Sequence, residues 1–143
     1  MPNKKIKIFI VDDDVFYLRL LEIQFLESAN FDIMAFESGE LCIDNLYRKP
    51  DLIVLDYHLD GINKHALTGI QALDKIKEID ASIPVVILSS QDKIEVAVDC
   101  MHHKAFDYVV KSETAFMRLK NIVNTIAKYS KMESQLSWYM DRM

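Results

Sequence analysis

Asp56 and the three acids at positions 12–14 are the residues of this chain with the clearest chemical potential. Each group follows a short apolar segment, residues 52–55 in one case and 6–11 in the other. Short β-branched segments of this kind predict strands. If these two strands are parallel neighbours, their acids meet at the carboxyl edge of one sheet, where open α/β sheets bind ligands. Carboxylates gathered at one point repel one another and favour a hard cation such as Mg²⁺.

The elements that must position these acids follow an alternating pattern. Strands are expected at residues 6–11, 32–36, 52–55, 84–89 and 106–110, and helices at 15–28, 40–48, 69–79 and 93–103. Asp14 and Ser38 are predicted to cap the helices that follow them. Five β/α repeats predict an α/β fold with a five-stranded parallel sheet of the flavodoxin-like (βα)5 order 2-1-3-4-5. This order makes strands 1 and 3 neighbours.

Two further polar residues are expected at the same edge. Ser89 ends the fourth predicted strand and Lys111 follows the fifth. A carboxylate can act as a nucleophile toward phosphorus and form an aspartyl-phosphate. Phosphoryl transfer mainly requires alignment and positive charge around the transferring group. A hydroxyl, an ammonium and a metal-binding acid cluster at one edge therefore indicate phosphoryl chemistry on Asp56.

Taken in order, these motifs resemble the receiver domain of two-component response regulators. The resemblance covers roughly residues 5–125. Four segments carry it, each at or near a strand end: Val11-Asp12-Asp13-Asp14, Asp56 after its strand, Ile83-Pro84-Val85 through Ser89, and Phe106-Asp107-Tyr108-Val109-Val110-Lys111. The resemblance implies a phosphorylatable signalling switch that takes its phosphoryl group from a histidine kinase or a phosphotransfer protein. It implies no enzymatic activity beyond assistance to its own phosphorylation and dephosphorylation.

The resemblance also implies a role for each site residue. Asp56 would accept the phosphoryl group, with Lys111 and Ser89 contacting its oxygens. The implied Mg²⁺ ligands are Asp13 and Asp56 directly, Asp12 through water, and the backbone carbonyl of His58. Tyr108 would be the aromatic switch residue, whose ring turns inward when the Ser89 hydroxyl moves toward the phosphoryl group. His58 and Gln91 occupy positions that influence hydrolysis of the phosphoryl group in this family.

Composition excludes several other classes of protein. The chain has 143 residues and a net charge of −5, which fits one domain and argues against direct nucleic-acid binding. It has no apolar segment long enough for a membrane span and no signal peptide, so we expect a cytoplasmic protein. Cys42 and Cys100 match no metal-ligand spacing and are predicted to be buried free thiols. The four histidines are predicted to lie at the surface.

Three features depart from the family pattern. The loop at residues 57–69 is longer than usual after the acceptor and lacks the usual proline, and we hypothesise that it selects partners. Ser112 follows Lys111 where proline is common, so either a cis bond or a different placement of Lys111 is open. Lys104 stands in a turn where glycine is usual and would carry modest strain at a positive φ.

The end of the chain continues the apolar helical spacing with no glycine or proline after Ser112. We expect a receiver domain over residues 1–127 and an extension of the last helix over 128–143. An exposed apolar stripe on that extension needs a partner. It would serve either as a dimerisation helix or as a linker to an output domain.

Three other functions are weighed against the phosphorylated switch. A receiver-like module that only dimerises, without phosphorylation, would not need the full acid and lysine set. A haloacid-dehalogenase-type phosphatase would need an acid two residues after its nucleophile, where this chain has His58. A flavin-binding protein would need a phosphate loop where this chain has three acids.

Overall fold

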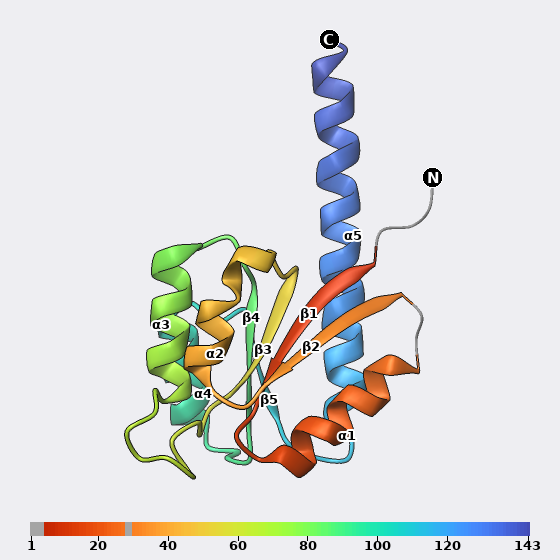
Figure 1. Cartoon of the computed structure of the whole chain (residues 1–143). Helices are drawn as coiled ribbons and strands as arrows, with labels where there is room; N and C mark the ends of the chain where they lie inside the picture. The colour runs from red at the N-terminus through yellow and green to blue at the C-terminus, as the bar shows by residue number, and fades with distance from the viewer. Residues whose placement is uncertain (1–4, 28–29) are drawn as a thin grey trace.

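The computed structural model describes residues 5–27 and 30–143. Its strands are β1 Ile6–Val11, β2 Phe31–Phe36, β3 Leu52–Asp56, β4 Val85–Ser89 and β5 Asp107–Val110. Its helices are α1 Val15–Leu26, α2 Gly39–Asp44, α3 Gly69–Ile79, α4 Ile94–His102 and α5 Ala115–Asp141, with a 3₁₀ turn at Leu46–Arg48. Strands and helices alternate along the chain as the sequence pattern predicts (Figure 1).

The five strands form one parallel sheet in the order β2-β1-β3-β4-β5, which confirms the predicted topology. The register pairs Val11 with Leu55 and Asp56 with Leu88, so the ends of β1, β3 and β4 lie at one edge. β3 and β4 are buried along their whole lengths. Their continuous apolar sequences are typical of strands covered on both faces.

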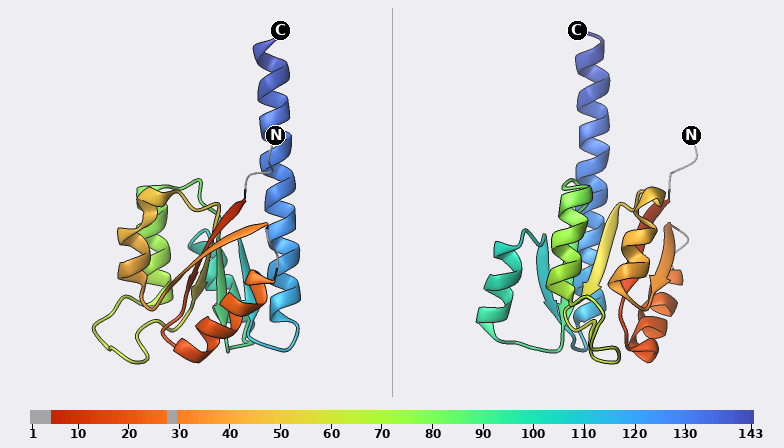
Figure 2. Two further views of the ribbon diagram at one scale, coloured as in Figure 1. Left: turned by 45° about the vertical axis from the view of Figure 1, so that its right-hand side comes forward. Right: turned by 60° about the vertical axis from the view of Figure 1, so that its left-hand side comes forward.

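Two helical layers cover the sheet (Figure 2). Helices α1 and α5 pack on one face around Phe25, Leu119 and the even-numbered residues of β1, such as Ile8. Helices α2, α3 and α4 pack on the other face around Leu73, Cys100 and the odd-numbered residues of β1. Successive strand side chains point to opposite faces, so each strand contributes to both cores. The two packed layers hold the carboxyl edge of the sheet in a fixed geometry.

Helix caps set where three of the helices begin. The Asp14 carboxylate accepts hydrogen bonds from the Phe16 and Tyr17 amides, and the Ser38 hydroxyl accepts one from the Leu41 amide. Both predicted caps are thereby confirmed. Thr68 and Gln71 form a reciprocal capping box at the start of α3. A cap of this kind stabilises a helix by roughly 1 kcal/mol and fixes where the loop before it must end.

The length predicted for the second helix is wrong. The helix was expected over residues 40–48, but α2 ends at Asp44 and a 3₁₀ turn follows. The Asn45 side chain donates to the Leu41 carbonyl and accepts from Arg48, which replaces regular helical bonding. Lys49 then adopts a left-handed φ of 56° before Pro50. Other boundaries differ by one or two residues, and the predicted end of the first helix at Ser28 lies outside the described residues.

Helix α5 is a single element of 27 residues, as the unbroken apolar spacing predicts. At about 1.5 Å per residue it is about 40 Å long. Its first half packs on the sheet, and its second half rises past the domain body at the end of the sheet opposite the β1–α1 and β3–α3 loops (Figure 1). In the described part of the chain, no helix is both long and apolar enough to cross a membrane.

Candidate functional site

The carboxyl edge of the sheet brings together the acids predicted to form the site. Asp12 follows β1 and Asp56 ends β3, and both are almost completely buried. Asp13 is partly buried beside them. One carboxylate oxygen from each of the three lies within 4.8 Å of the other two. The adjacency of β1 and β3 therefore places three acids around one point.

Lys111, after β5, supplies the positive charge at this point. Its ammonium lies 2.9 Å from Asp12 Oδ2 and 3.3 Å from Asp56 Oδ1. Its Nζ also lies 4.4 Å from the centre of the Tyr17 ring, a cation–π geometry. The Lys111 amide donates to the Ser89 carbonyl at 2.7 Å, which fixes the backbone of this residue against β4. Lys111 thus reaches the acids from the end of β5, across the neighbouring strand β4.

Burial and like charge shift the protonation of the central acid. Burial, together with the negative charge of Asp12, raises the pKa of Asp56 to about 7, although Lys111 opposes the shift. Burial alone would lower the pKa of Lys111, but the neighbouring Asp12 and Asp56 outweigh it and raise that pKa. One ammonium does not compensate three carboxylates. The site therefore favours an additional cation.

The donor set fits a hard divalent cation such as Mg²⁺. Three carboxylates converge, and hard cations prefer oxygen ligands. Asp12 Oδ2 is buried and, among the described residues, receives no donor with good hydrogen-bond geometry, although the Lys111 ammonium lies 2.9 Å away. A buried carboxylate oxygen whose only partner is an ion pair still has lone pairs that can bind a cation or a water molecule on that cation. Asp12 Oδ1 already accepts from the Asp14 amide at 2.9 Å.

The predicted Ser89 and Tyr108 meet at the end of β4. The Ser89 hydroxyl is fully buried and accepts from the Gln91 amide at 3.0 Å. The Tyr108 hydroxyl donates to the Gln91 carbonyl, and the Tyr108 ring is buried. The backbone of Gln91 therefore joins the strand-end hydroxyl to the tyrosine. The side chain of Gln91 lies 3.2 Å from His58 Nε2, which bridges the ends of β3 and β4.

The long loop after Asp56 folds back on the acid cluster. The Gly61 and Ile62 amides donate to Asp13 Oδ2 at 3.1 and 3.2 Å. Gly69 closes the loop by donating its amide to the Tyr57 carbonyl at 3.0 Å. A Cβ at Gly69 would lie 2.4 Å from the Asp56 carbonyl oxygen, so only glycine permits this close approach.

Two backbone features near β5 were left open by the sequence: the Lys111–Ser112 peptide bond and the φ angle of Lys104. No peptide bond in the described ranges, 5–27 and 30–143, is cis, so the Lys111–Ser112 bond is trans. Lys111 nonetheless reaches both acids. Lys104 has a φ of 70°, in the left-handed region expected for a position that usually holds glycine.

Three histidines, His58, His65 and His102, are exposed as predicted. His103 is different, because it is half-buried between α3 and α4. Its Nδ1 lies 2.8 Å from Asp74 Oδ1, and its Nε2 lies 3.7 Å from Asp99 Oδ1. Cys42 and Cys100 are buried and free, as expected.

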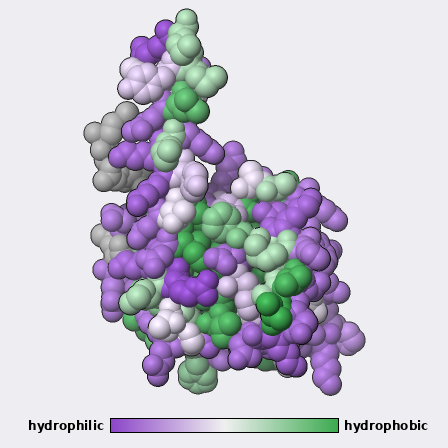
Figure 3. All heavy atoms as spheres, turned by 180° about the vertical axis from the view of Figure 1, so that it is seen from behind, coloured by the Kyte–Doolittle hydropathy of each residue, from purple (hydrophilic) through white to green (hydrophobic). Residues whose placement is uncertain are grey.

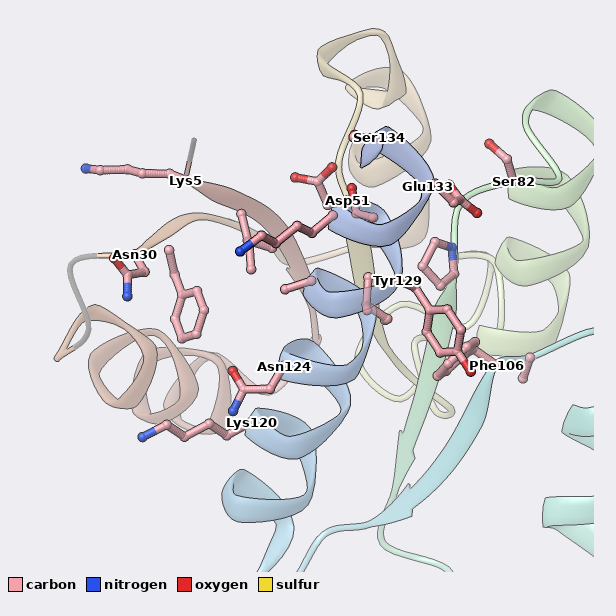
Figure 4. A pocket seen from close by; sticks show the side chains of 18 of the residues that line it. Lys5, Asn30, Asp51, Ser82, Phe106, Lys120, Asn124, Tyr129, Glu133 and Ser134 are labelled. Atoms are coloured by element: carbon pink, nitrogen blue, oxygen red, sulfur yellow. The ribbon is translucent and has the colours of Figure 1, made fainter. Parts of the chain in front are cut away.

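The surface of the described residues has at least two hollows. A small one of about 330 Å³ lies beside Asp56 and is lined by Tyr57, His58 and Asp60 among others. A larger one of about 1390 Å³ lies at the opposite, amino edge of the sheet, between α5 and the strand starts (Figure 4). Tyr129 and Glu133 of α5 line one of its sides. This larger hollow is remote from the acids and takes no part in their chemistry.

Sequence reasoning missed two groups at the site. Tyr17 lies on the first turn of α1, four residues after Asp13, and that spacing is a signal that could have placed it near the acids. The Gly61 and Ile62 amides were missed because backbone donors in a loop leave no residue-type signal. Both groups contact charged residues that the sequence did identify.

Comparison with known proteins places this geometry in a family. Residues 8–124 match the family model described as the response regulator receiver domain. The chain is 30% identical over 117 residues to a protein-glutamate methylesterase/protein-glutamine glutaminase of Clostridium acetobutylicum, covering 79% of this chain and 32% of that protein. It is also 30% identical over 113 residues to the regulatory protein LuxO of Vibrio cholerae, covering 78% of this chain and 24% of that protein. The chain thus matches a third or less of the length of these relatives.

Solved structures give the same result. The signal receiver domain of a putative LuxO repressor protein from Vibrio parahaemolyticus superposes with a TM-score of 0.77 at 27% identity, covering 92% of this chain and 97% of that one. The receiver domain of the Francisella response regulator 1452 superposes with a TM-score of 0.74 at 25% identity, covering 88% and 99%.

Proposed function

Because this chain belongs to the response regulator receiver domain family, we propose that it is a phosphorylation switch whose acceptor is Asp56. The observation that carries the proposal is the convergence of three carboxylates with Lys111, whose ammonium lies 3.3 Å from Asp56 Oδ1. A structural ion pair would need only one acid. The additional acids, held in a buried cluster, support a cation-assisted reaction on the central one.

The proposed reaction transfers a phosphoryl group from a phosphohistidine of a kinase or phosphotransfer protein. A carboxylate oxygen of Asp56 forms a bond to phosphorus, the phosphorus–nitrogen bond breaks, and the imidazole nitrogen that leaves takes up a proton. Lys111 contacts a phosphoryl oxygen and offsets its charge. The Ser89 hydroxyl, at the end of the adjacent strand, donates a hydrogen bond to another oxygen. These groups act by positioning and electrostatics, as phosphoryl transfer requires.

Mg²⁺ is the proposed cofactor. Asp13, Asp56 and the His58 backbone carbonyl would bind it directly, and Asp12 would bind it through water. The ion supplies positive charge to the transferring phosphoryl group. The chain's own contribution is to hold one carboxylate oxygen from each of the three acids within 4.8 Å of the other two, and to leave Asp12 Oδ2 with the Lys111 ammonium as an ion-pair partner but without a well-oriented hydrogen-bond donor in the described structure.

The proposed conformational response runs through Tyr108. When Ser89 turns its hydroxyl toward the phosphoryl group, its bond from the Gln91 amide is lost and the β4–α4 connection changes. In this structure the Tyr108 ring is already buried and its hydroxyl donates to the Gln91 carbonyl, so phosphorylation would stabilise this position of the ring and would not have to turn it inward. The inward ring would stabilise the rearranged connection, so a charge change at Asp56 biases a two-state element. The chain would act as a signalling switch that controls a partner or an output domain.

We also propose that residues 1–127 form the receiver and that residues 128–143 form an assembly helix. The side chains of the extension are exposed, including Leu136, Met140 and Met143. Seen from behind, hydrophobic and hydrophilic surface alternate on the projecting helix (Figure 3). Pairing with a second copy would cover them as a short coiled coil. A linker to an output domain would use the same helix and is the other outcome of an assembly measurement.

The function is tested by intact mass spectrometry after incubation with Mg²⁺ and a small acyl phosphate donor. We expect a gain of one phosphoryl group that requires Mg²⁺ and is lost in Asp56→Asn. Asp44→Asn, an exposed acid on α2, is the matched control and should gain the group normally. A folded wild-type protein that gains nothing would contradict the proposal and favour a module that only assembles.

A further inference from the structure

The acceptor loop, residues 57–69, contacts the acid cluster through its backbone. Two consecutive amides, those of Gly61 and Ile62, donate to the same oxygen, Asp13 Oδ2, at 3.1 and 3.2 Å. The Ile62 side chain is 78% exposed, so hydrophobic packing does not hold the loop at this point. A Cβ at Gly61 would lie 3.2 Å from Asp13 Oδ2, closer than such contacts normally are. The loop therefore approaches Asp13 for its main-chain donors.

Several anchors fix these amides in place. Leu59, three residues after Asp56, is 1% exposed and packs in the core beneath the loop. The Leu67 amide donates to the Glu40 carboxylate at 3.3 Å, and Gly69 is pinned to Tyr57. Residues 60–66 thus form a loop segment whose two ends are both held by contacts with the rest of the domain. A loop segment held at both ends keeps its backbone amides in a fixed orientation toward Asp13.

We propose that the Gly61 and Ile62 amides are an outer shell of the metal site and position the Asp13 carboxylate for Mg²⁺. The inference rests on the proposed function. A carboxylate has about four acceptor positions on two oxygens, so one oxygen can accept both amides while the other binds a cation. Hydrogen bonds to a ligating carboxylate fix its orientation, and losing such a partner typically weakens metal binding by about 10–100-fold. The long loop is thereby a part of the metal site.

A pair of substitutions at one residue separates the amide from the side chain. Ile62→Pro removes the N–H, whereas Ile62→Ala removes most of an exposed side chain and keeps the N–H. Isothermal titration calorimetry with Mg²⁺ alone should give wild-type affinity for Ile62→Ala and about tenfold weaker binding for Ile62→Pro. Equal affinity in wild type and Ile62→Pro would overturn the proposal. Equal weakening by both variants would also overturn it, because the side chain would then be responsible.

A second measurement covers the case in which proline distorts the loop. Amide hydrogen exchange, followed by NMR, should be slower at Gly61 and Ile62 in the wild type than in Asp13→Ala. The Ala66 amide donates to the Asn63 carbonyl at 3.0 Å and serves as an internal control that should not change. Unchanged exchange at Gly61 and Ile62 in Asp13→Ala would contradict the proposal.

Both measurements are independent of phosphoryl transfer. A wild-type protein that binds no Mg²⁺ would overturn the inference together with the metal part of the proposed function. Wild-type Mg²⁺ binding that Ile62→Pro leaves intact would overturn the inference alone.

Discussion

Asp56 is buried beside Asp12 and Lys111. This environment determines the pH at which the Asp56 carboxyl ionises in the metal-free site. An acid whose pKa is raised on folding is more costly to ionise in the folded protein than in the unfolded chain. The ordinary pKa is 3.8, and the folded value is about 7. The contribution of Asp56 therefore lowers stability progressively as pH rises from about 4 to about 7. Above that range the metal-free protein carries the full destabilisation.

Asp56→Asn should therefore stabilise the metal-free protein. In EDTA at about pH 8 we expect the free energy of unfolding to rise by roughly 1–4 kcal/mol, because the neutral amide removes a buried charge. The gain should shrink as pH falls from about 7 to about 4, because below that range the Asp56 carboxyl is protonated in both the folded and the unfolded state. Urea unfolding of the wild type, Asp56→Asn and the exposed control Asp44→Asn measures it. A destabilised Asp56→Asn at about pH 8 would show that the ionised carboxylate is favoured, in contradiction to this account.

The site residues at strand ends could be predicted because topology alone brings them together. Each site residue ends or follows an apolar strand: Asp56 and Ser89 end β3 and β4, and Asp12 and Lys111 follow β1 and β5. A parallel sheet gathers such positions at one edge. Their catalytic and ligand roles remain predictions. Tyr17 was not predicted, because its contact with Lys111 depends on the rotamers of two long side chains.

Among the elements, the acceptor loop depends most on one residue. Gly69 has no Cβ, and one placed there would lie 2.4 Å from the Asp56 carbonyl oxygen and 2.7 Å from the Tyr57 Cα. Both neighbours are backbone atoms at the end of β3, so they cannot move aside without displacing Asp56.

Gly69→Ala should consequently lower the free energy of unfolding by about 2–3 kcal/mol. Gly61→Ala is the comparison, because its new Cβ would meet only a partly buried side chain. It should cost less than about 1 kcal/mol. Urea unfolding measures both, and a Gly69→Ala variant as stable as Gly61→Ala would contradict the close approach.

His103 links α3 to α4 in a pH-dependent way. Its hydrogen bond to Asp74, with the charges of Asp74 and Asp99, raises the pKa of His103 above the ordinary value of 6.5. The stabilisation is therefore fully present below about pH 6.5 and is lost as pH rises through the folded pKa. His103→Gln should be less stable than wild type near pH 5.5 and nearly equal near pH 8.5. Urea midpoints at both pH values measure this, and a pH-independent difference would contradict the link.

Secondary structure was predictable where the period was long and uninterrupted, as in α5. Secondary structure was harder to predict where side chains compete with the backbone for hydrogen bonds. Asn45 ends α2 early by bonding to the Leu41 carbonyl, an effect of a single side chain that periodicity does not detect. The contact of the acceptor loop with Asp13 was likewise invisible, since any residue except proline supplies an amide.

In the whole molecule, the acid cluster and the projecting part of α5 lie at opposite ends of the sheet (Figure 1). Helix α5 begins four residues after Lys111 and runs the length of the domain before it projects. The same helix thus packs on the receiver core through Leu119 and Val123 and carries the exposed apolar side chains farther on. An assembly formed by the extension would leave the acceptor edge accessible to a kinase.

Leu136→Asp tests this assembly. Leu136 is 61% exposed, so the substitution should leave the receiver folded. If two copies pair, a charge in the seam should raise the dimer dissociation constant by about tenfold or more. Sedimentation velocity over a range of concentrations measures this, with Gln135→Asp, one residue away, as the control. A wild-type chain that stays monomeric would contradict pairing and favour the linker role.

The most direct test of the central proposal is to locate the phosphoryl group. After reaction with Mg²⁺ and an acyl phosphate donor, borohydride reduces an aspartyl-phosphate to homoserine and releases phosphate. Peptide mass spectrometry then identifies the residue. We predict homoserine at position 56 alone, and none when Mg²⁺ is omitted. Homoserine at position 12 or 13, or at no position in a folded protein, would contradict the assignment of Asp56 as the acceptor.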